Sequence, residues 1–309
     1  MAGMRGVTIR QLQIFASTAR NLSISQSSKE LHLTQPAVSM QIRQLEDSAG
    51  LPLFERGGKR LRLTQAGEEM QRYALQVLGA LKDAQDTFAA LKGLRGGRIT
   101  IAVVSTAKYF APKLLALFAG QHPDVEIRLS VNNREAVVEQ LTANEIDLAI
   151  MGTAPRTLDA TAAPFAKHPL VVVAPPNHPL ARRRRIPLKT LESETFLVRE
   201  PGSGTRSAME RFFGSHGLRV KVGMEMESNE TIKQAVMAGM GVAFISQHTI
   251  GLEVAAGQLQ VLRVEGLPVI RQWNVVHRQE KRLSPAAQAF KAFVLEEGAA
   301  FLKRWPPAR

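Results

Sequence analysis

A run of apolar residues that alternates spacings of four and three dominates the sequence between positions 64 and 92. Its members are Met70, Ala74, Val77, Leu81, Ala84, Phe88 and Leu91. This heptad seam predicts a long helix that pairs two chains as a two-stranded coiled coil, with a helix packed against its own domain as the alternative. The glycine-rich segment 93–97 that follows has the composition of a hinge. The chain is therefore divided into an N-terminal part, 1–63, a linker and dimerisation helix, 64–92, and a larger C-terminal part.

Composition limits what kind of protein this can be. The chain has 309 residues, 45% of them hydrophobic, enough for two or three ordinary domains. No apolar run has the length of roughly 20 residues that spans a bilayer. The N-terminus lacks a signal-peptide pattern, so we expect a cytoplasmic protein outside the membrane. The sequence has no cysteine, and its net charge of +13 favours a polyanionic partner, although attraction to membrane surfaces or solubility alone would also explain the charge.

The first fifty residues predict three short helices. Ile9, Leu12 and Phe15 recur at helical spacing, Ser23 starts a second helix by capping it, and Thr34 caps a third. This order is typical of a helix-turn-helix, in which the third helix enters the major groove of DNA. A plain helical hairpin with a solvated polar face is the alternative. On the DNA reading, the contacting residues of the third helix are Thr34, Gln35, Pro36, Ser39 and Arg43.

A basic hairpin is predicted over 52–63. Apolar Leu53 and Phe54 lead into a run of arginine, glycine and lysine, and alternation resumes through Leu61 and Leu63. Such a wing would bring basic side chains to DNA phosphates, which set affinity and register but not sequence preference. A solvated charged loop is the alternative. The predicted phosphate contacts are Arg56, Lys59, Arg60 and Arg62.

The C-terminal part predicts two α/β lobes. Strands and helices alternate from Ile99 to Met151, and a second series runs from Leu170 to Ser246. A returning strand, Pro268 to His277, and a helix starting at Ser284-Pro285 should rejoin the first lobe. We assign 98–165 and 266–309 to lobe I and 166–265 to lobe II. Ligands bind at the carboxyl ends of such strands, which here carry Ser105, Thr106, Asn132, Asn133, Met151 and Gly152, without indicating which asparagine faces the cleft.

The segment Pro201-Gly-Ser-Gly-Thr-Arg206 follows a strand and opens a helix. Its free N–H groups, hydroxyls and arginine favour an anion, although an ordinary glycine turn would look the same. From this loop we predict effector contacts by Gly202, Ser203, Gly204, Thr205 and Arg206. Further candidates, which capping or solvation would also explain, are Asn229 and Thr231 at the next helix start and Lys108 and Arg134 in lobe I.

Other readings are weaker. The seven histidines show no metal-ligand spacing, and neither a G-x-S-x-G elbow nor a P-loop occurs, so we predict no enzyme, no metal and no cofactor. A plain solute-binding protein would require an export signal and would leave the wing and the heptad helix unexplained. The run Arg182 to Arg185 could touch DNA, but a solvated loop is favoured.

Four linked motifs resemble the N-terminal signature of LysR-type regulators. They are Thr34-Gln-Pro-Ala-Val-Ser39, Gln41-Ile-Arg-Gln-Leu-Glu46, Leu53-Phe-Glu-Arg56 and Leu63-Thr-Gln-Ala-Gly67, with Ser27-Ser28 as a departure where the family usually has alanines. The resemblance implies a winged helix-turn-helix, a long linker helix and a two-lobed effector domain shaped like a periplasmic binding protein. The linker helix would pair two chains. As a hypothesis for the mechanism, we expect promoter DNA and RNA polymerase as partners, and dimers that associate into a tetramer.

Three C-terminal segments are similar to LysR-type activators of Calvin-cycle carbon-fixation operons. They are Thr106-Ala-Lys-Tyr-Phe-Ala-Pro112, Arg199-Glu-Pro-Gly-Ser-Gly-Thr-Arg206 and Ser228-Asn-Glu-Thr-Ile-Lys-Gln-Ala-Val236. This similarity implies a phosphorylated metabolite or a nicotinamide nucleotide as the regulatory ligand. A LysR-type regulator of another metabolic operon is the alternative. The sequence does not give the operator, the identity of the ligand, the geometry of a tetramer interface or whether the ligand activates or represses.

Overall fold

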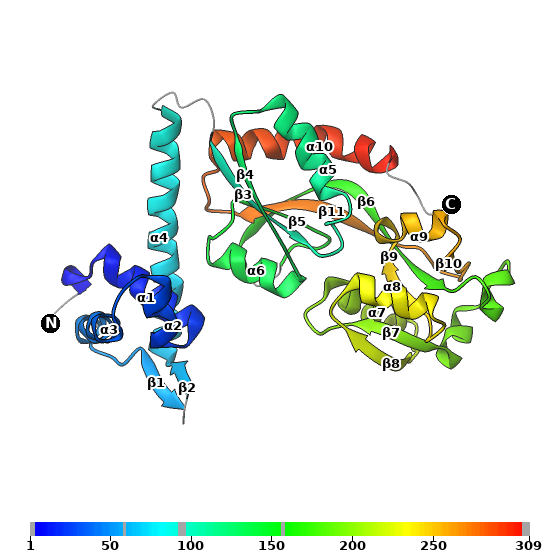
Figure 1. The fold of residues 1–309 in the computed structure, drawn as a ribbon, viewed down its shortest axis with the longest axis horizontal. Coiled ribbons are helices and arrows are strands. Elements are labelled where there is room, and N and C mark those ends of the chain that lie inside the picture. The colour runs from blue at the N-terminus through cyan, green and yellow to red at the C-terminus, as the bar shows by residue number, and fades with distance from the viewer. Residues whose placement is uncertain (1–3, 58–59, 92–96, 156–157, 305–309) are drawn as a thin grey trace. The chain divides into compact units, whose positions relative to one another are not determined.

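The computed structural model describes residues 4–57, 60–91, 97–155 and 158–304 (Figure 1). The chain divides into two compact units. One comprises Met1–Phe88 with the short segment Thr142–Glu145, and the other comprises Ala89–Leu141 and Ile146–Arg309. No helix among the described residues is long and apolar enough to cross a membrane.

The N-terminal unit begins with three α-helices, each capped by the side chain of the residue that directly precedes it. α1 spans Ile9–Asn21, α2 Ile24–Glu30 and α3 Gln35–Ala49. Thr8, Ser23 and Thr34 each accept a hydrogen bond from a backbone N–H in the following turn, which satisfies groups that a helix start leaves free. The two predicted caps, Ser23 and Thr34, are therefore confirmed.

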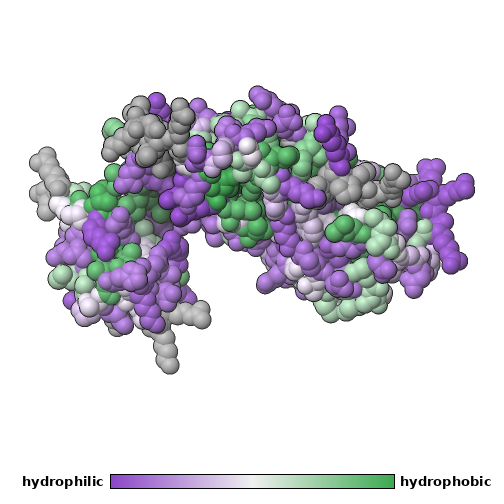
Figure 2. Space-filling view, turned by 45° about the horizontal axis from the view of Figure 1, so that its top comes forward, coloured by the Kyte–Doolittle hydropathy of each residue, from purple (hydrophilic) through white to green (hydrophobic). Residues whose placement is uncertain are grey.

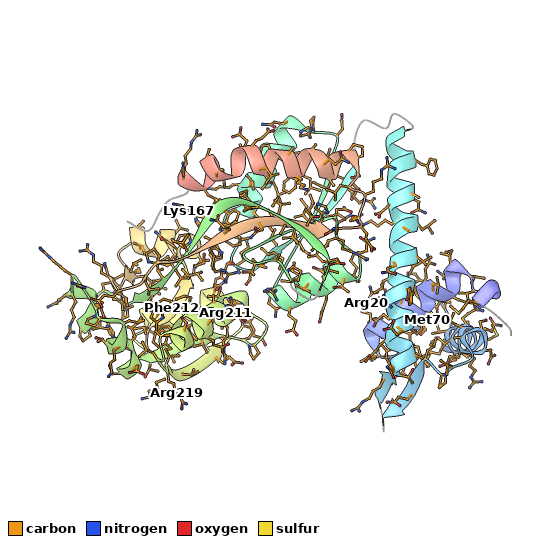
Figure 3. The ribbon with its side chains drawn as sticks, turned by 180° about the vertical axis from the view of Figure 1, so that it is seen from behind. Arg20, Met70, Lys167, Arg211, Phe212 and Arg219 are labelled. Carbon is orange, nitrogen blue, oxygen red and sulfur yellow. The ribbon has the colours of Figure 1, made fainter. Side chains whose placement is uncertain are left out.

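A short hairpin and a long helix complete this unit. β1, Phe54–Gly57, pairs antiparallel with β2, Arg60–Leu63, and α4 runs from Gln65 to Leu91. The core buries Leu12 and Phe15 of α1 and Leu45 of α3 together with Met70 and Ala74 of α4. Figure 3 shows Met70 on the side of α4 that faces α1 and α3. The first turns of α4 therefore belong to the N-terminal core.

The C-terminal unit is built on one sheet that runs through both of its lobes. Its strand order is β10-β6-β11-β5-β3-β4, and β9 pairs with β6. β3, Arg98–Val104, is central to lobe I and pairs parallel with β4, Glu126–Asn132, and with β5, Leu148–Met151. The helices α5, Ala111–Gln121, and α10, Pro285–Arg304, pack together through Phe118 and Phe290, while α6 spans Arg134–Thr142. This arrangement is the predicted alternation of strands and helices.

Two long strands connect the lobes. β11, Val269–Arg278, pairs antiparallel along its whole length with the Ala160–Leu170 part of β6, Ala160–Ala174 (Figure 1). Phe165 and Trp273 contribute to the core of lobe I, whereas Leu170 contributes to a core of lobe II. The expectation that a strand starts near Leu170 was wrong by ten residues, because alternating half-buried positions from Ala160 onward already pair with β11.

Lobe II packs helices against strands on this connection. β7, Thr195–Arg199, pairs parallel with β8, Lys221–Met226, and β9, Ala243–Ser246, and β10, Gln260–Val261, pair with β6. The helices of lobe II are α7, Gly204–Ser215, α8, Asn229–Met237, and α9, Gly251–Ala255, with short 3-10 helices at Pro179–Arg182, Leu188–Ser193 and Gln247–Thr249. A further 3-10 helix, Met4–Gly6, precedes α1 in the N-terminal unit. The loops at the carboxyl ends of β3 and β7 thus meet near the connecting strands.

The arginine run lies on the surface of lobe II. Arg182, Arg183, Arg184 and Arg185 are all exposed, and Arg185 pairs with Glu265. Figure 2 shows hydrophilic residues gathered at the end of the C-terminal unit that carries this loop. Exposure agrees with the favoured solvated-loop reading.

Candidate functional site

The recognition helix α3 presents a polar face to solvent. Its opposite face is closed by Val38, Ile42 and Leu45, which are buried. The residues predicted to contact DNA lie outside this buried apolar face. Thr34, Gln35, Pro36 and Arg43 are exposed, Ser39 is half-buried, and Thr34 Oγ1 also accepts the Ala37 N–H at 3.3 Å. A helix fixed on one face and open on the other is able to enter a DNA groove.

The wing is described in part. β1 and β2 form the predicted basic hairpin, with Glu55 opposite Arg62 and Gly57 opposite Arg60. The Arg62 side chain is exposed, as a phosphate contact requires. Lys59 lies outside the described residues, and of Arg56 and Arg60 only the backbone is described.

The predicted dimerisation seam of α4 must be corrected at its start. Met70 is 8% exposed and Ala74 1%, because both pack against α1 and α3 in the core of their own chain. The seam residues further along the helix are exposed to solvent. Val77, Leu81, Ala84 and Phe88 are exposed, and the side chain of Leu91 lies outside the described part. The available apolar stripe is therefore shorter than the heptad pattern suggests.

A polar pocket lies where the lobes of the C-terminal unit meet at the connecting strands. We call it the anion pocket, and its lining is Val104, Ser105, Thr106, Arg134, Gly152, His168, Ser203, Gly204, Thr205 and Arg271. Ser203 caps α7, accepting hydrogen bonds from the N–H groups of Thr205 and Arg206. The pocket thus combines the start of a helix, several hydroxyl groups and two guanidinium groups, all of which favour a bound anion.

Arg271 is the most unusual group in the anion pocket. Its Nη1 donates to the carbonyl oxygen of Gly204 at 2.8 Å and its Nη2 to Thr153 Oγ1 at 2.9 Å, while the buried Nε has no partner in the described part of the chain. Burial lowers the pKa of Arg271 to about 10, and the positive charges of Arg211 and Arg134 add to this effect. The charged form of Arg271 is therefore disfavoured by its surroundings.

Arg134 shares this condition. It starts α6, and burial lowers its pKa, with a further contribution from the charge of Arg211. Within the described ranges, neither Arg134 nor Arg271 forms an ion pair with a carboxylate. Two partly desolvated arginines without a counter-charge would gain free energy from a bound anion.

A second pocket shares the lining residue Ser105 with the first. It is lined by amides and charged groups, and we call it the amide pocket: Ser105, Lys108, Val131, Asn132, Asn133, Arg199, Glu200, Pro201, Glu225, Glu227, Ser228 and Asn229. Asn132 and Asn133 therefore both line the cleft, and the Nδ2 of Asn229, which is 1% exposed, has no partner among described groups. Lys108 pairs with Glu230 at 2.7 Å, which links the two lobes.

Four predicted effector contacts lie elsewhere. Met151 is fully buried in the core of lobe I, since its strand is apolar on both faces. Arg206 pairs with Glu210 and with Glu225, which neutralise it outside the anion pocket. Gly202 and Thr231 line neither pocket: Gly202 packs beside the Glu135 carboxylate, and Thr231 is an exposed residue of the first turn of α8.

Three of the cleft residues that were not predicted from the sequence are Arg271, His168 and Arg199. Arg271 and His168 lie on the connecting strands, and Arg199 ends β7, where it bonds Glu200, Asn229 and Ser105. A signal existed for Arg271, because an arginine within the apolar segment Val-Ile-Arg-Gln-Trp-Asn-Val-Val is costly to bury without a purpose. No such signal existed for His168, because a histidine directly before a proline predicts a turn.

These features together define a class of protein. A winged helix-turn-helix joined to a two-lobed domain with an anion pocket is the architecture of a DNA-binding regulator that responds to a small molecule. Two family models match the chain: "Bacterial regulatory helix-turn-helix protein, lysR family" over residues 9–68, and "LysR substrate binding domain" over residues 92–299. The chain belongs to the LysR family of transcriptional regulators.

Individual relatives are similar over nearly the whole length. The RuBisCO operon transcriptional regulator of Allochromatium vinosum is 50% identical, covering 95% of this chain and 97% of the relative. The HTH-type transcriptional regulator CfxR of Cupriavidus necator is also 50% identical, covering 97% and 95%. Among solved structures, the Synechocystis PCC6803 CcmR regulatory domain in complex with 2-PG is 41% identical, with a TM-score of 0.63, covering 65% of this chain and 96% of that domain.

Proposed function

We propose that this regulator controls carbon-fixation genes of the Calvin cycle and activates them when a small phosphorylated anion occupies the anion pocket. The observation that carries the ligand class is the pair Arg134 and Arg271, partly buried and without a carboxylate partner among the described residues. The similarity to RuBisCO operon regulators supports the choice of genes. Binding of 2-PG by the CcmR regulatory domain supports a small anion, and makes 2-PG the first ligand to test.

The anion would be held from both lobes. Ser203, Thr205 and the positive end of the α7 dipole approach it from lobe II, and Ser105, Thr106 and Arg134 approach it from lobe I. Charge-assisted hydrogen bonds of this kind are short and strong, and arginine matches the geometry of a phosphate better than other side chains do. Ligands that extend further would reach the amides of Asn132, Asn133 and Asn229.

DNA recognition would use the open face of α3 and the wing. Arg43 and Gln35 are exposed and can each bond a base edge bidentately, while Arg62 and the other basic wing residues would contact phosphates. Two chains would pair through the exposed part of the α4 seam, from Val77 to Phe88, and bring two recognition helices to half-sites in the promoter.

The proposed mechanism couples these parts in the cytoplasm. Dimers associate further into a tetramer, and ligand-dependent closure of the cleft alters the spacing of the DNA-binding units. The bend imposed on promoter DNA then changes, and RNA polymerase gains access. Regulation of a different metabolic operon by the same mechanism is the second candidate, which the identity of the bound promoter distinguishes.

The test is a gel shift across a salt series, with the promoter of a RuBisCO operon and with random DNA of equal length. We expect tight binding to the promoter, a footprint with two-fold symmetry, and a change of the complex when 2-PG is added. Arg182→Ala is a matched control, since it removes an exposed arginine outside the proposed contacts. Promoter binding that no phosphorylated metabolite alters would leave a LysR-type regulator and refute the proposed ligand class.

A further inference from the structure

His168 occupies a position in the anion pocket that the proposed effector would reach. It stands directly opposite Arg271 in the antiparallel pairing of β6 with β11. Because side chains alternate along a strand, this pair faces one side of the connecting strands, and the next pair, Lys167 and Gln272, faces the other. Lys167, labelled in Figure 3, lies toward α10, whereas His168 lines the anion pocket.

The ring of His168 is held in one orientation by its surroundings. It stacks on the indole of Trp273, with the ring centroids 3.8 Å apart and an angle of 11° between the planes. Its Nε2 lies 2.9 Å from Ser246 Oγ, and the whole residue is only 2% exposed. The other nitrogen, Nδ1, has no hydrogen-bond partner in the described part of the chain. A buried polar atom without a partner is rare in a folded protein and requires an explanation.

Gly152 shows where this unpartnered nitrogen points. A Cβ added at Gly152 would lie 2.9 Å from His168 Nδ1 and 2.3 Å from Arg271 Nη2. Glycine at residue 152, directly after β5, therefore lets both polar groups pack closely against the backbone, where any larger residue would clash with them. His168 Nδ1 and Arg271 Nη2 are thus neighbours at one place in the lining of the anion pocket.

We propose that His168 binds the effector anion directly through Nδ1 and takes up a proton when the anion binds. The inference rests on the proposed function, because it needs an anion in this pocket. In the occupied pocket, Nδ1–H would donate to the anion, Nε2–H would donate to Ser246 Oγ, and the face of Trp273 would stabilise the positive ring. Both ring nitrogens would then have partners.

The charges around His168 explain why the proton arrives only with the anion. Arg271 on β11, Arg134 on α6, Arg211 on α7 and His248 after β9 are the ionisable groups that face it or act on its neighbours, and the arginines are cations. Burial lowers the pKa of His168 well below 6.5, with further contributions from Arg271 and His248. A bound anion brings negative charge within hydrogen-bond distance and reverses that balance.

The consequence is that the connecting strands sense occupancy directly. His168 and Arg271 belong to the two strands that join the lobes, so a ligand that bonds both of them acts on the segment about which the lobes would move. Ligand affinity should accordingly increase as the pH falls from 8 toward 6, because protonation and anion binding favour each other.

The test is calorimetry of the full-length protein at pH 7 with 2-PG, repeated in two buffers that differ in ionisation enthalpy. Sulfate, whose charge is constant in this range, serves as a second probe, so that protonation of the ligand cannot account for the result. Wild-type protein should take up a substantial fraction of one proton per site with either probe. His168→Asn keeps an N–H near the position of Nδ1 but cannot ionise, so it should take up none and bind about tenfold more weakly.

Two further variants separate binding from structure. Ser246→Ala should reduce proton uptake, because the imidazolium loses its Nε2 partner. His277→Asn is the matched control, since His277 is a buried histidine of β11 outside the anion pocket, and it should leave uptake unchanged. Equal uptake and affinity in wild type and His168→Asn would overturn the inference while leaving the proposed function intact. Failure of the wild type to bind either probe would overturn both.

Discussion

Replacing Arg271 with methionine should separate the stability of the empty protein from its response to ligand. Methionine retains the apolar part of the side chain and removes the charge. Burial, as the main cause, lowers the pKa of Arg271 to about 10, and a lowering of this size corresponds to about 3 kcal/mol. At neutral pH this amount disfavours the folded state, because the charged form is the one that burial penalises.

The variant also loses two favourable contacts. The hydrogen bonds to the Gly204 carbonyl and to Thr153 contribute about 1 kcal/mol each. Their loss nearly cancels the free energy gained by removing the buried charge. We therefore expect the ligand-free variant to be as stable as wild type or slightly more stable. Ligand binding, in contrast, loses a charge-assisted contact of about 2–2.7 kcal/mol, which weakens it about 30- to 100-fold.

Thermal unfolding with and without 2-PG measures both quantities. At a ligand concentration of 100 times the wild-type Kd, binding stabilises wild type by about 2.7 kcal/mol, whereas the variant should gain only about 0.4–0.9 kcal/mol. Arg211→Met is the matched control, because Arg211 is an exposed arginine that acts on Arg271 through its charge alone (Figure 3). A variant that loses several kcal/mol without ligand, yet keeps the full ligand-induced shift, would refute the reasoning.

Three other predictions address other parts of the chain. Arg43→Ala should weaken binding to the specific operator about tenfold or more while affinity for random DNA changes little in gel shifts at equal salt; equal losses would assign Arg43 to a phosphate. Met70→Ala should lower the free energy of unfolding by about 2–5 kcal/mol, whereas Phe88→Ala should leave it unchanged and weaken self-association in sedimentation, and the opposite result would restore the full seam. For Glu230, burial raises the pKa, but hydrogen bonds, chiefly from Lys108 and Tyr109, outweigh burial and lower the pKa to about 2. The ionised Glu230 carboxylate therefore contributes to stability above pH 4.5, and this contribution is lost as the pH falls toward 2. Glu230→Gln should flatten acid unfolding curves in that window, and an unaltered curve would contradict the assignment.

Local chemistry explains why the helix-turn-helix could be predicted. Ser23 and Thr34 mark the starts of α2 and α3, and the fixed φ of Pro36 suits a first turn. These signals act within a few residues, so no knowledge of the fold was needed. The seam of α4 shows the limit of such reasoning, since periodicity states which residues share a face but not what that face contacts. The core of the N-terminal unit covers Met70 and Ala74 and leaves Phe88 exposed.

The effector pocket combines residues that sequence reasoning could and could not find. Ser105, Ser203 and Thr205 follow strands or open a helix, where ligand sites are expected, and they do line the anion pocket. Arg206 was the predicted anion contact, but its charge is taken by Glu210, one turn further along α7, and by Glu225 on the neighbouring strand. The first of these pairs, at a spacing of four residues on one helix, was visible in the sequence.

The role of Arg271 depends on strand register, which explains why composition and spacing failed to indicate it. Arg271 and His168 are separated by more than 100 positions, and only the pairing of β6 with β11 makes them neighbours on one face. A shift of that pairing by one residue would present Gln272 and turn the guanidinium toward α10. The register shift between Trp273 and Asn274 follows two residues beyond Arg271. The charge of the pocket is therefore set by the register of the two strands that join the lobes, so ligand recognition and the connection between the lobes depend on the same residues.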